Sequence, residues 1–439
     1  MINLFEHYNQ ASWDLHYSLI VSGYNNPTIA VNDNGFLPED VTSPYLYFTG
    51  FDKAQGQPLY FNAIEVPEFW EITGNNSHGE IFEFDQKRAH IHYAEPKHKR
   101  LVQSVDWYDH NGRVRVIDRY NQFGYRYAQT NVNLQGQETF TTYFNQDNQE
   151  VITENHTTGD IILNSQGKVH LFQNRAEFVT FYLKTAGYEL DRIFYNSLST
   201  PFLVAYSLDR PGQDVLFWQE PIAESLPGNM TLLYEATRRQ TKVVVQKQAA
   251  YDKMQSLMTP KQALKTAFLG FLYPFKRPNT RRKEILILTN SDQLEGIEEL
   301  VSQQMAYHYH IGAITEMSSK LMNMGRYRNV SLYPNISQQQ VGRLFATCDY
   351  YLDINQGNEI LSAIRAAFEN NMLILAFENT RHNPLYTAAE NTFASGDVAG
   401  MNRVLKALAD KPELLTDLLA KQTKAANVET TERYQEVIR

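Results

Sequence analysis

The chain has 439 residues, of which 43% are hydrophobic and 13% aromatic, and its formal net charge is −9. This length suggests about three domains, and the negative charge argues against a nucleic-acid-binding surface. The single cysteine, Cys348, excludes an intrachain disulfide and favours a reducing compartment. The first residues lack the features of a secretion signal, and no apolar run reaches the roughly 20 residues of a membrane-spanning helix. We therefore expect a soluble, cytoplasmic protein of several domains.

The first part of the chain combines a short helical segment with a long antiparallel one. Residues 1–42 predict a helix and then a strand, because Leu4, Tyr8 and Leu15 fall near helical spacing before the short run at 28–31. From about residue 45 to 172, aromatic and β-branched runs alternate with turn signals, which predicts an antiparallel meander. Its clearest hairpin turns at Asn111-Gly112, because Asn-Gly supplies positive φ angles. Further turns are predicted at residues 74–76, 121–124, 134–136, 158–160 and 165–167.

After Asn174, strands and helices alternate, which predicts parallel sheets covered by helices. The simplest α/β architecture with this order has two Rossmann-like domains, the first interrupted by the meander. Small-molecule sites in such folds lie beyond the carboxyl ends of the strands. Predicted strands cover 215–218, 242–246, 285–288, 309–314, 330–333, 350–354 and 372–377, and predicted helices cover 175–186, 338–346, 359–368, 398–409 and 412–422. The predicted limits are 1–42 and 174–259 for the first Rossmann-like domain, 43–173 for the insertion, 260–423 for the second Rossmann-like domain and 424–439 for a helical tail.

Two segments that flank predicted strands lie where a nucleotide-sugar would bind. Residues 289–296 keep the frame of the G-R-L-x-x-x-K-G loop, but Asn290 stands at the Arg position and Glu295 at the Lys position. Residues 358–366 align with E-G-F-G-L-x-x-x-E, with Asn358 and Ala366 at the two glutamates and with Glu359 and Leu361 at the glycines. The C-terminal half thus resembles retaining GT-B glycosyltransferases whose donor positions are lost. A carboxylate beside a diphosphate is repulsive, by about 4 kcal/mol per close pair. The resemblance implies a chain without catalytic residues and without a bound cofactor.

The turn after the strand near residue 217 reads Trp218-Gln219-Glu220-Pro221, without the histidine that active relatives with such an insertion tend to carry. Together with residues 32–38 and 43–45, this pattern resembles the non-catalytic stabilising subunits of accessory-Sec O-glycosyltransferases, the GtfB type. The resemblance implies a GT-B pseudoenzyme that stabilises a GtfA-type catalytic subunit in a heterotetramer. Such a complex transfers GlcNAc, or Glc, from a UDP-sugar to serines and threonines of a serine-rich repeat adhesin before export.

An extended serine-rich acceptor would be held by many weak contacts in a cleft or along a sheet edge. We expect the acceptor to contact the loop after the strand at 350–354 and the turn after residue 217. The tyrosines, phenylalanines and amides of the meander suit sugar and peptide contacts, and they equally suit an ordinary solvent face. The expected acceptor residues are Trp218, Gln219, Glu220, Asn355, Gln356, Gly357, Asn358 and Glu359.

Two other functions remain open at this stage. One is an active retaining transferase that uses a UDP-sugar, if the donor motifs align differently. The other is a stand-alone carbohydrate- or peptide-binding protein that reuses the fold. Titration with UDP distinguishes an active transferase from a non-catalytic subunit. Co-purification with a transferase distinguishes a non-catalytic subunit from a stand-alone binding protein.

Three further features have a structural reading and a functional one. His90 and His92 lie on one face of a predicted strand, with His98 and His110 nearby, but no fixed set of metal ligands is evident, so a structural role without metal is expected. Cys348 is expected to be a buried thiol at a helix end. Apolar residues recur at helical spacing over 264–275 and precede a basic cluster at 276–283, which predicts an interdomain helix or a peripheral membrane contact.

Overall fold

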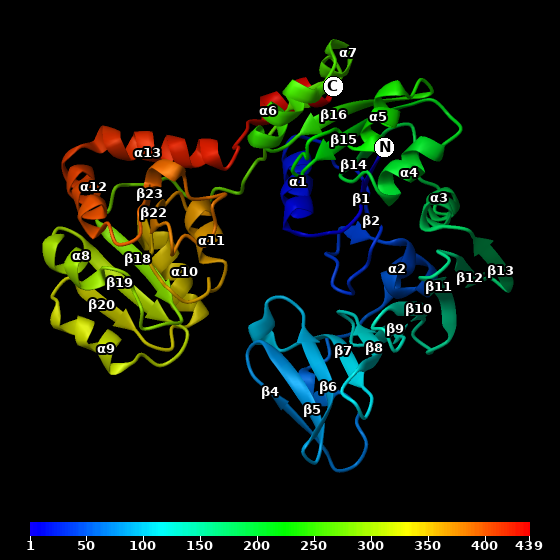
Figure 1. Ribbon diagram of the computed structural model, residues 1–439, viewed down its shortest axis with the longest axis horizontal. Helices are drawn as coiled ribbons and strands as arrows, with labels where there is room; N and C mark the ends of the chain where they lie inside the picture. Colours follow the sequence, from blue (N-terminus) through cyan, green and yellow to red (C-terminus); the bar gives the residue numbers. More distant parts are fainter. The chain divides into compact units, whose positions relative to one another are not determined.

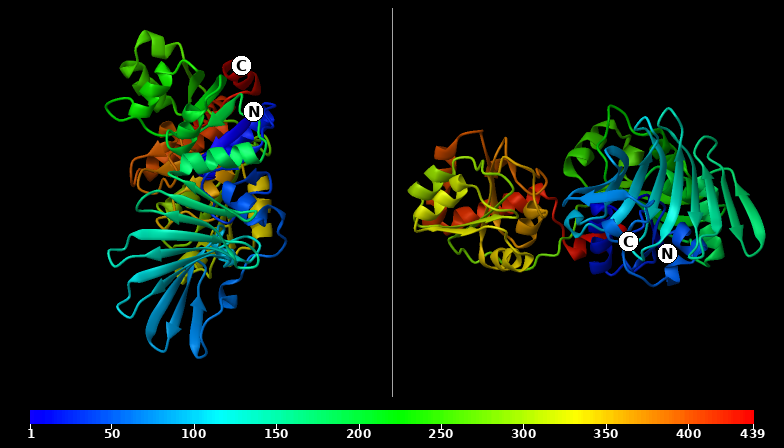
Figure 2. Two further views of the ribbon diagram at one scale, coloured as in Figure 1. Left: turned by 90° about the vertical axis from the view of Figure 1, so that its right-hand side faces the viewer. Right: turned by 90° about the horizontal axis from the view of Figure 1, so that it is seen from below.

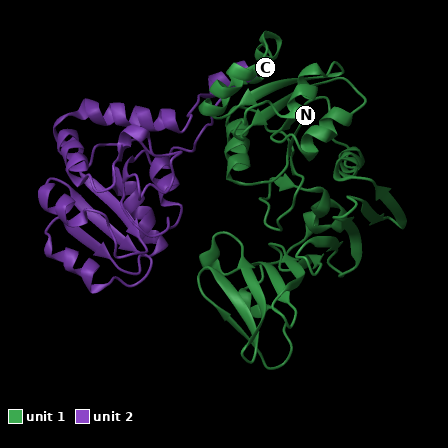
Figure 3. Cartoon of the chain, viewed as in Figure 1, with its two compact units in different colours: residues 1–268, 438 green, residues 269–437, 439 purple.

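The computed structural model describes residues 1–439 and divides into two compact units (Figure 3). Unit 1 comprises residues 1–268 with Ile438, and unit 2 comprises residues 269–437 with Arg439. Each unit contains a parallel sheet with helices, and unit 1 also contains a large antiparallel sheet (Figure 1). This arrangement confirms the predicted α/β architecture with a meander insertion. The limits given for the individual domains stay predictions, since the structure separates only two units.

The parallel sheet of unit 1 has the order β17-β16-β15-β14-β1-β2-β3. Strands β1, β2 and β14 are buried throughout, and β15 and β16 end in apolar, buried runs, as expected of a parallel sheet between helices. The first strand, Ile2–Phe5, corrects the prediction of a helix at this position: four buried residues are too short a run to show a period. The elements are β1 (Ile2–Phe5), α1 (Gln10–Val21), β2 (Thr28–Ala30), β3 (Val41–Thr42), α3 (Arg175–Thr185), β14 (Ile193–Tyr195), α4 (Thr200–Ser207), β15 (Gly212–Trp218), α5 (Gly228–Glu235), β16 (Arg239–Val245), α6 (Gln248–Leu257), α7 (Pro260–Ala263) and β17 (Thr266–Phe268).

Between β3 and β14 the chain forms a ten-stranded antiparallel sheet in sequential order from β4 to β13, which Figure 2 shows as one twisted fan. All the predicted turns lie between neighbouring strands, and Gly112 has the expected positive φ of 75°. The predicted onset at residue 45 is wrong, because Ser43 caps α2 (Pro44–Thr49) by accepting from the Leu46 N–H. The strands are β4 (Trp70–Gly74), β5 (His78–Glu83), β6 (Gln86–Tyr93), β7 (Val102–Tyr108), β8 (Val114–Tyr120), β9 (Arg126–Val132), β10 (Glu138–Phe144), β11 (Glu150–Asn155), β12 (Ile161–Ser165) and β13 (Lys168–Phe172).

The two ends of this sheet are packed differently. Buried side chains of β11 to β13, such as Ile152, Leu163 and Phe172, belong to the same hydrophobic core as Leu4 and Tyr182 of the Rossmann-like part. The β4 to β7 end has its own smaller core, built around Ile81, Ile91 and Val105 among other residues. The insertion is therefore anchored at one end and self-supporting at the other.

Unit 2 has a six-stranded parallel sheet in the order β20-β19-β18-β21-β22-β23. Every strand predicted after residue 280 is present, but α11 begins at Ala363 and not at residue 359. The helix of the C-terminal tail is α14, which ends at Ile438. The elements are β18 (Glu284–Thr289), α8 (Ile297–Gln303), β19 (His308–Ala313), α9 (Ser319–Met322), β20 (Val330–Tyr333), α10 (Gln338–Thr347), β21 (Tyr350–Asp353), α11 (Ala363–Glu369), β22 (Leu373–Phe377), β23 (Thr392–Phe393), α12 (Val398–Asp410), α13 (Pro412–Ala425) and α14 (Thr431–Ile438).

The helix predicted over residues 264–275 is absent. Thr266–Phe268 adds to the first sheet as β17, and Phe271 forms an isolated bridge with Val428 in unit 2. Leu264 is 87% exposed, but Leu269 and Phe271 are buried, so the predicted apolar stripe does not form one exposed face. No helix of the chain has the length and apolar character needed to cross a membrane.

Two arginines of the basic cluster at residues 276–283 bind a buried carboxylate in unit 2. Arg277 and Arg282 both pair with the Asp349 carboxylate, over 2.5 and 3.1 Å. Burial opposes ionisation of Asp349, but hydrogen bonds from these arginines hold its pKa down at about 2. The neighbouring Cys348 ends α10, where burial raises the pKa of its thiol to about 12. Its predicted burial is confirmed. Within the basic cluster, Arg277 and Arg282 are paired inside the unit, whereas Arg281 and Lys283 are exposed, and the membrane contact stays a prediction.

Candidate functional site

The strand order of unit 2 selects one edge of its sheet as the candidate site. The order reverses between β18 and β21, and ligands of such folds bind beyond the carboxyl ends of the strands at that switch point. The loops after these two strands are joined there by hydrogen bonds from the Glu295 N–H to Ile354 O, over 2.9 Å, and from the Gln356 N–H to Gln293 O, over 3.0 Å. The donor positions Asn290, Glu295 and Asn358 thus lie on adjoining loops, whereas Ala366 lies within α11.

Glu295 uses its carboxylate to hold loops together. Its Oε1 accepts a hydrogen bond of 2.6 Å from the Gly396 N–H, and its Oε2 accepts from the amides of Asn379 and Gln356. The adjacent Gly296 has a φ of 66° and leaves no room for a Cβ, which would lie 2.4 Å from Val398 Cγ2. The position that carries a cation in the resembled transferases therefore carries an anion whose oxygens already have partners.

Asn355 is the centre of the loop after β21. The residue is 4% exposed, and its Oδ1 accepts from the Gly357 N–H over 3.0 Å and lies 2.8 Å from Thr289 Oγ1. Its Nδ2 donates to Asn290 Oδ1 and to Asn358 O, over 3.2 and 3.1 Å. These contacts occupy both N–H donors of the amide, and its oxygen accepts from the Gly357 N–H. Asn355 therefore shapes the loop through polar groups that are bonded within it.

His382 closes the same loop from the other side. Its Nδ1 lies 2.6 Å from Asp353 Oδ1, and its Nε2 lies 2.7 Å from Gly357 O. The hydrogen bond with Asp353, helped by the one to Gly357, raises the pKa of His382 to about 9. Both ring nitrogens therefore donate, and the imidazolium holds Gly357 to the end of β21. His382 is not among the residues predicted from the sequence, where its only signal is a histidine in the segment that follows a predicted strand.

The backbone keeps a conformation that suits glycine although the glycines are gone. Leu361 and Ser362 have φ values of 54° and 48°, in the left-handed region that costs a residue with a Cβ roughly 1–2 kcal/mol. Leu361 stands at a glycine position of the resembled motif. Glu359, at the other glycine position, accepts from the Ile364 N–H over 3.0 Å and so satisfies a donor in the first turn of α11. This explains why the helix begins later than predicted.

Among the acceptor residues predicted in unit 2, the exposed side chains are Gln356, Asn358 and Glu359. In unit 1, Trp218 and Gln219 are 4% and 9% exposed, and Glu220 is exposed. The Gln219 amide donates to Ala11 O and to Gln246 Oε1, over 2.9 and 2.8 Å. The structure thus turns three of the predicted acceptor side chains, Trp218, Gln219 and Asn355, inward.

Unit 1 has its own switch point, between β1 and β14, and none of the predicted site residues directly follows either strand. Glu6 follows β1, and its carboxylate accepts from Asn32 Nδ2 and from the Thr200 N–H, over 3.0 and 3.1 Å. Asn196 follows β14 and accepts from the Glu6 N–H over 3.1 Å. These polar groups bind one another at the edge where a Rossmann-like sheet usually holds a ligand.

Four family models match successive parts of the chain. They are the GtfB N-terminal domain over residues 2–48, the GtfB middle domain over 70–173, the GtfB third domain over 175–257 and the GftB/GlyA-F C-terminal domain over 285–422. In the same order, the matches cover the first strands of the parallel sheet of unit 1, the meander, the later strands of that parallel sheet, and unit 2.

Curated relatives and solved structures agree with these matches. The UDP-N-acetylglucosamine–peptide N-acetylglucosaminyltransferase stabilizing protein GtfB of Streptococcus agalactiae is 46% identical over 439 residues, which cover 100% of this chain and 99% of the relative. The protein of the same name from Streptococcus parasanguinis is 49% identical over 387 residues, 88% of each chain. A chain in the crystal structure of a GtfA/B complex bound to UDP and GlcNAc has a TM-score of 0.93 and 44% identity, with 99% of this chain and 98% of that chain covered.

TarM shares the fold alone, at a TM-score of 0.51 and 12% identity, with 100% of this chain and 98% of that chain covered. Together with the two parallel sheets and the antiparallel insertion, these likenesses confirm the predicted GT-B fold. The identity and the coverage extend over the whole length of the chain. The chain therefore belongs to the GtfB family of stabilising proteins of peptide N-acetylglucosaminyltransferases.

Proposed function

We propose that this chain is the non-catalytic subunit of a cytoplasmic peptide O-glycosyltransferase. It stabilises a GtfA-type catalytic subunit and holds a serine-rich acceptor while the partner transfers GlcNAc from UDP-GlcNAc. The observation that carries the proposal is Glu295, an anion bound into the loop network at a position where the resembled transferases need a cation. Full-length similarity to proteins named as stabilising subunits supports the same role.

In this proposal, the degenerate donor site holds two loops together and does not bind a nucleotide-sugar. A diphosphate near Glu295 would meet a carboxylate, at a cost of about 4 kcal/mol for a close pair. Asn290 offers no positive charge, and its Oδ1 accepts from Asn355. A diphosphate at the Glu295 carboxylate would also have to displace the Gly396 N–H and the Asn379 amide, which already donate to it.

We place the contact with the catalytic subunit at the outer edge of the meander, on β12 and β13. Val169 and Leu171 are 72% and 68% exposed on the edge strand, and Ile162, paired with Leu171, is 39% exposed. An edge strand with exposed apolar side chains is a surface that proteins normally cover. Because β11 to β13 share their core with the Rossmann-like part, this edge is held rigidly.

We place acceptor contacts of unit 2 on the exposed side chains of the loop after β21, Gln356, Asn358 and Glu359, and contacts of unit 1 at Glu220. Amide and carboxylate groups bind peptide N–H groups and hydroxyls, with about 0.5–1.5 kcal/mol net for each hydrogen bond. Many such contacts along a disordered chain would favour long repeats over short ones.

The decisive experiment compares a GtfA-type catalytic subunit expressed alone and together with this chain. We expect a stable complex of higher melting temperature, whose mass reports the predicted heterotetramer, and transfer of GlcNAc to a serine-rich peptide that depends on both chains. The isolated chain should show no transfer. Transfer by the isolated chain would instead establish an active enzyme, and a failure to co-purify would favour a stand-alone binding protein.

A further inference from the structure

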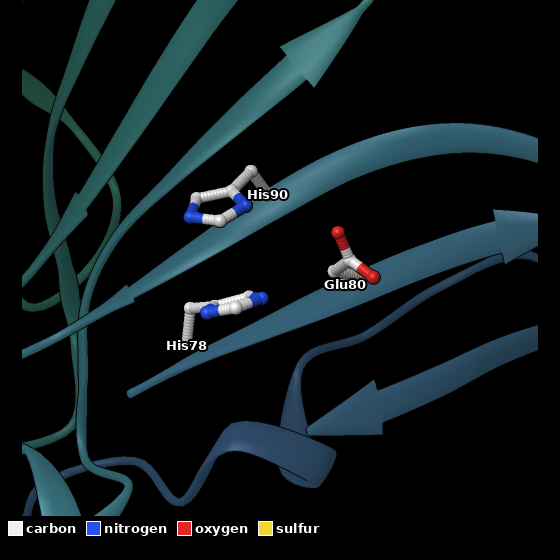
Figure 4. A group of neighbouring side chains, drawn as sticks. All are labelled: His78, Glu80 and His90. Carbon is white, nitrogen blue, oxygen red and sulfur yellow. The ribbon is translucent and has the colours of Figure 1, made fainter. Parts of the chain in front are cut away.

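Neighbouring strands of the meander place imidazole and carboxylate side chains on one face. Residues two apart on a strand share a face, which groups His78 with Glu80 on β5 and His90 with His92 on β6. The register pairs Glu80 with His90 and His78 with His92, so the two groups lie directly opposite each other. The sequence showed only the β6 pair, because pairing between strands cannot be read from spacing along one strand. Figure 4 shows the rings of His78 and His90 facing each other beside the Glu80 carboxylate.

The three side chains are close enough to share one ion. One ligand atom each from His78, Glu80 and His90 lies within 4.8 Å of the other two. All three residues are partly buried, and the ring centroids of the two histidines are 4.9 Å apart. Two imidazoles and one carboxylate form a ligand set that Zn²⁺ accepts, with water in the fourth position. Because the rings are stacked, they must rotate about χ2, a broad torsion, before their in-plane lone pairs converge.

A cation already lies among these acceptors. The Lys87 ammonium is 2.6 Å from Glu80 Oε1 and 3.4 Å from His90 Nδ1. Since an ammonium group can only donate, His90 Nδ1 faces it with its lone pair. Lys87 thus marks the point toward which a carboxylate oxygen and an imidazole nitrogen converge, and it would compete with a metal ion for that point.

We propose that His78, Glu80 and His90 form a binding site for a divalent transition-metal ion, Zn²⁺ by its ligand type, which displaces the Lys87 ammonium. The ion would join β5 to β6 in the end of the meander that has its own small core. Because only the folded hairpin brings the ligands together, binding would stabilise this end against unfolding. The proposal is independent of the function proposed above.

The test uses the full chain without a polyhistidine tag, after treatment with a chelator. Calorimetric titration with Zn²⁺ should show one saturable site per chain and a rise in melting temperature, and Co²⁺ should give a visible absorption band at the same stoichiometry. The variants Glu80→Gln and His78→Ala with His90→Ala should weaken binding by at least about tenfold, because even loss of a residue that only orients a metal ligand typically has an effect of this size. Lys87→Met removes the competing charge and should tighten binding.

His98→Ala is the matched control, because it removes an imidazole of the same meander outside the cluster and should leave the affinity unchanged. Circular dichroism and melting temperature without metal check that each variant is folded. Two outcomes overturn the proposal. One is no saturable Zn²⁺ binding by the folded wild-type chain, and the other is equal affinity in the wild type and in folded cluster variants.

Discussion

His382 and Asp353 are joined twice, through a 2.6 Å contact between Nδ1 and Oδ1 and through a 2.8 Å hydrogen bond from the His382 N–H to Oδ2. The remaining ring nitrogen lies 2.7 Å from Gly357 O. One imidazolium thus connects the end of β21 to the loop that follows it. The charged His382 side chain therefore fixes the loop at the switch point of unit 2.

Because His382 bonds to Asp353 and Gly357 as an imidazolium, we expect the protein to lose stability at alkaline pH. The folded-state pKa of His382 is about 9, above the ordinary value of 6.5. Its contribution is therefore complete below pH 6.5 and disappears as the pH rises through 9. We expect His382→Asn to lower the melting temperature near neutral pH and to have a much smaller effect above the folded pKa. A melting-temperature difference that stays constant across this range would rule out the titration of His382 as its source.

Substitutions in the loop after β21 should distinguish residues that stabilise the loop from residues that bind the acceptor peptide. Asn355→Ala removes the amide at the centre of the loop and should cost about 1–3 kcal/mol of unfolding free energy, because buried partners are left without hydrogen bonds. The double change Gln356→Ala and Asn358→Ala affects exposed side chains and should change stability by less than about 1 kcal/mol.

The same double variant should weaken binding of a serine-rich peptide by a few-fold, measured by fluorescence anisotropy with the assembled complex. Gln219→Ala is the matched amide control. Its side chain is buried and bonded within unit 1, so any weakening should be accompanied by a lower melting temperature. Unchanged peptide affinity in the double variant would move the acceptor site away from this loop.

Replacing Leu361 by glycine should stabilise the chain. Leu361 has a φ of 54° and is 39% exposed, so the strain removed should exceed the packing lost. We expect a gain of up to about 1 kcal/mol in unfolding free energy, with the greater freedom of glycine in the unfolded chain opposing it. Ala366→Gly, in the interior of α11, is the contrasting control and should destabilise. Chemical denaturation of both variants measures the difference, and destabilisation by Leu361→Gly would refute the strain argument.

The isolated chain should not bind UDP at sub-millimolar concentration. Asn290 and Glu295 supply no cation at the diphosphate position, and the Glu295 oxygens are engaged with Gly396 and Asn379. Calorimetric titration with UDP and with UDP-GlcNAc measures this directly, and the catalytic subunit provides the positive control. A micromolar affinity of the isolated chain would support the reading as an active transferase.

Charged substitutions on the edge of the meander should disrupt the complex. Val169→Lys with Leu171→Lys alters two exposed side chains of β13, so the monomer should fold normally while the catalytic subunit no longer co-elutes. Phe84→Lys, 83% exposed in the turn between β5 and β6, is the control for a general loss of apolar surface. Co-elution of the β13 variant would place the interface elsewhere.

Removal of residues 45–172 is a poorer test of the same interface. An insertion within the first Rossmann-like domain would suggest that the two-domain core can fold without this segment. However, Tyr45, Ile152 and Phe172 lie in the hydrophobic core of the Rossmann-like part, so the deletion would expose that core.

Local sequence signals predicted much of the architecture. Asn111-Gly112 predicted a hairpin because few residues adopt its backbone angles, and runs such as 285–288 predicted strands because a parallel sheet is buried on both faces. The segment 264–275 was predicted as a helix because its apolar residues repeat with a helical period, yet pairing with β16 makes Thr266–Phe268 a strand. Tertiary hydrogen bonds outweighed the local pattern there.

The sequence alone determined which residues stand at the motif positions, and it thereby predicts a degenerate donor site, because the charge of each residue is known without coordinates. Only the tertiary structure decided what the replacing residues do. Glu295 binds Gly396, 101 positions away, and His382 binds Asp353, 29 positions away. Likewise, the sequence could not tell that Asn355 and Gln219 point inward or that His78 lies beside His90. Contacts between residues far apart along the chain depend on strand order and register, and those are set by packing of the whole sheet.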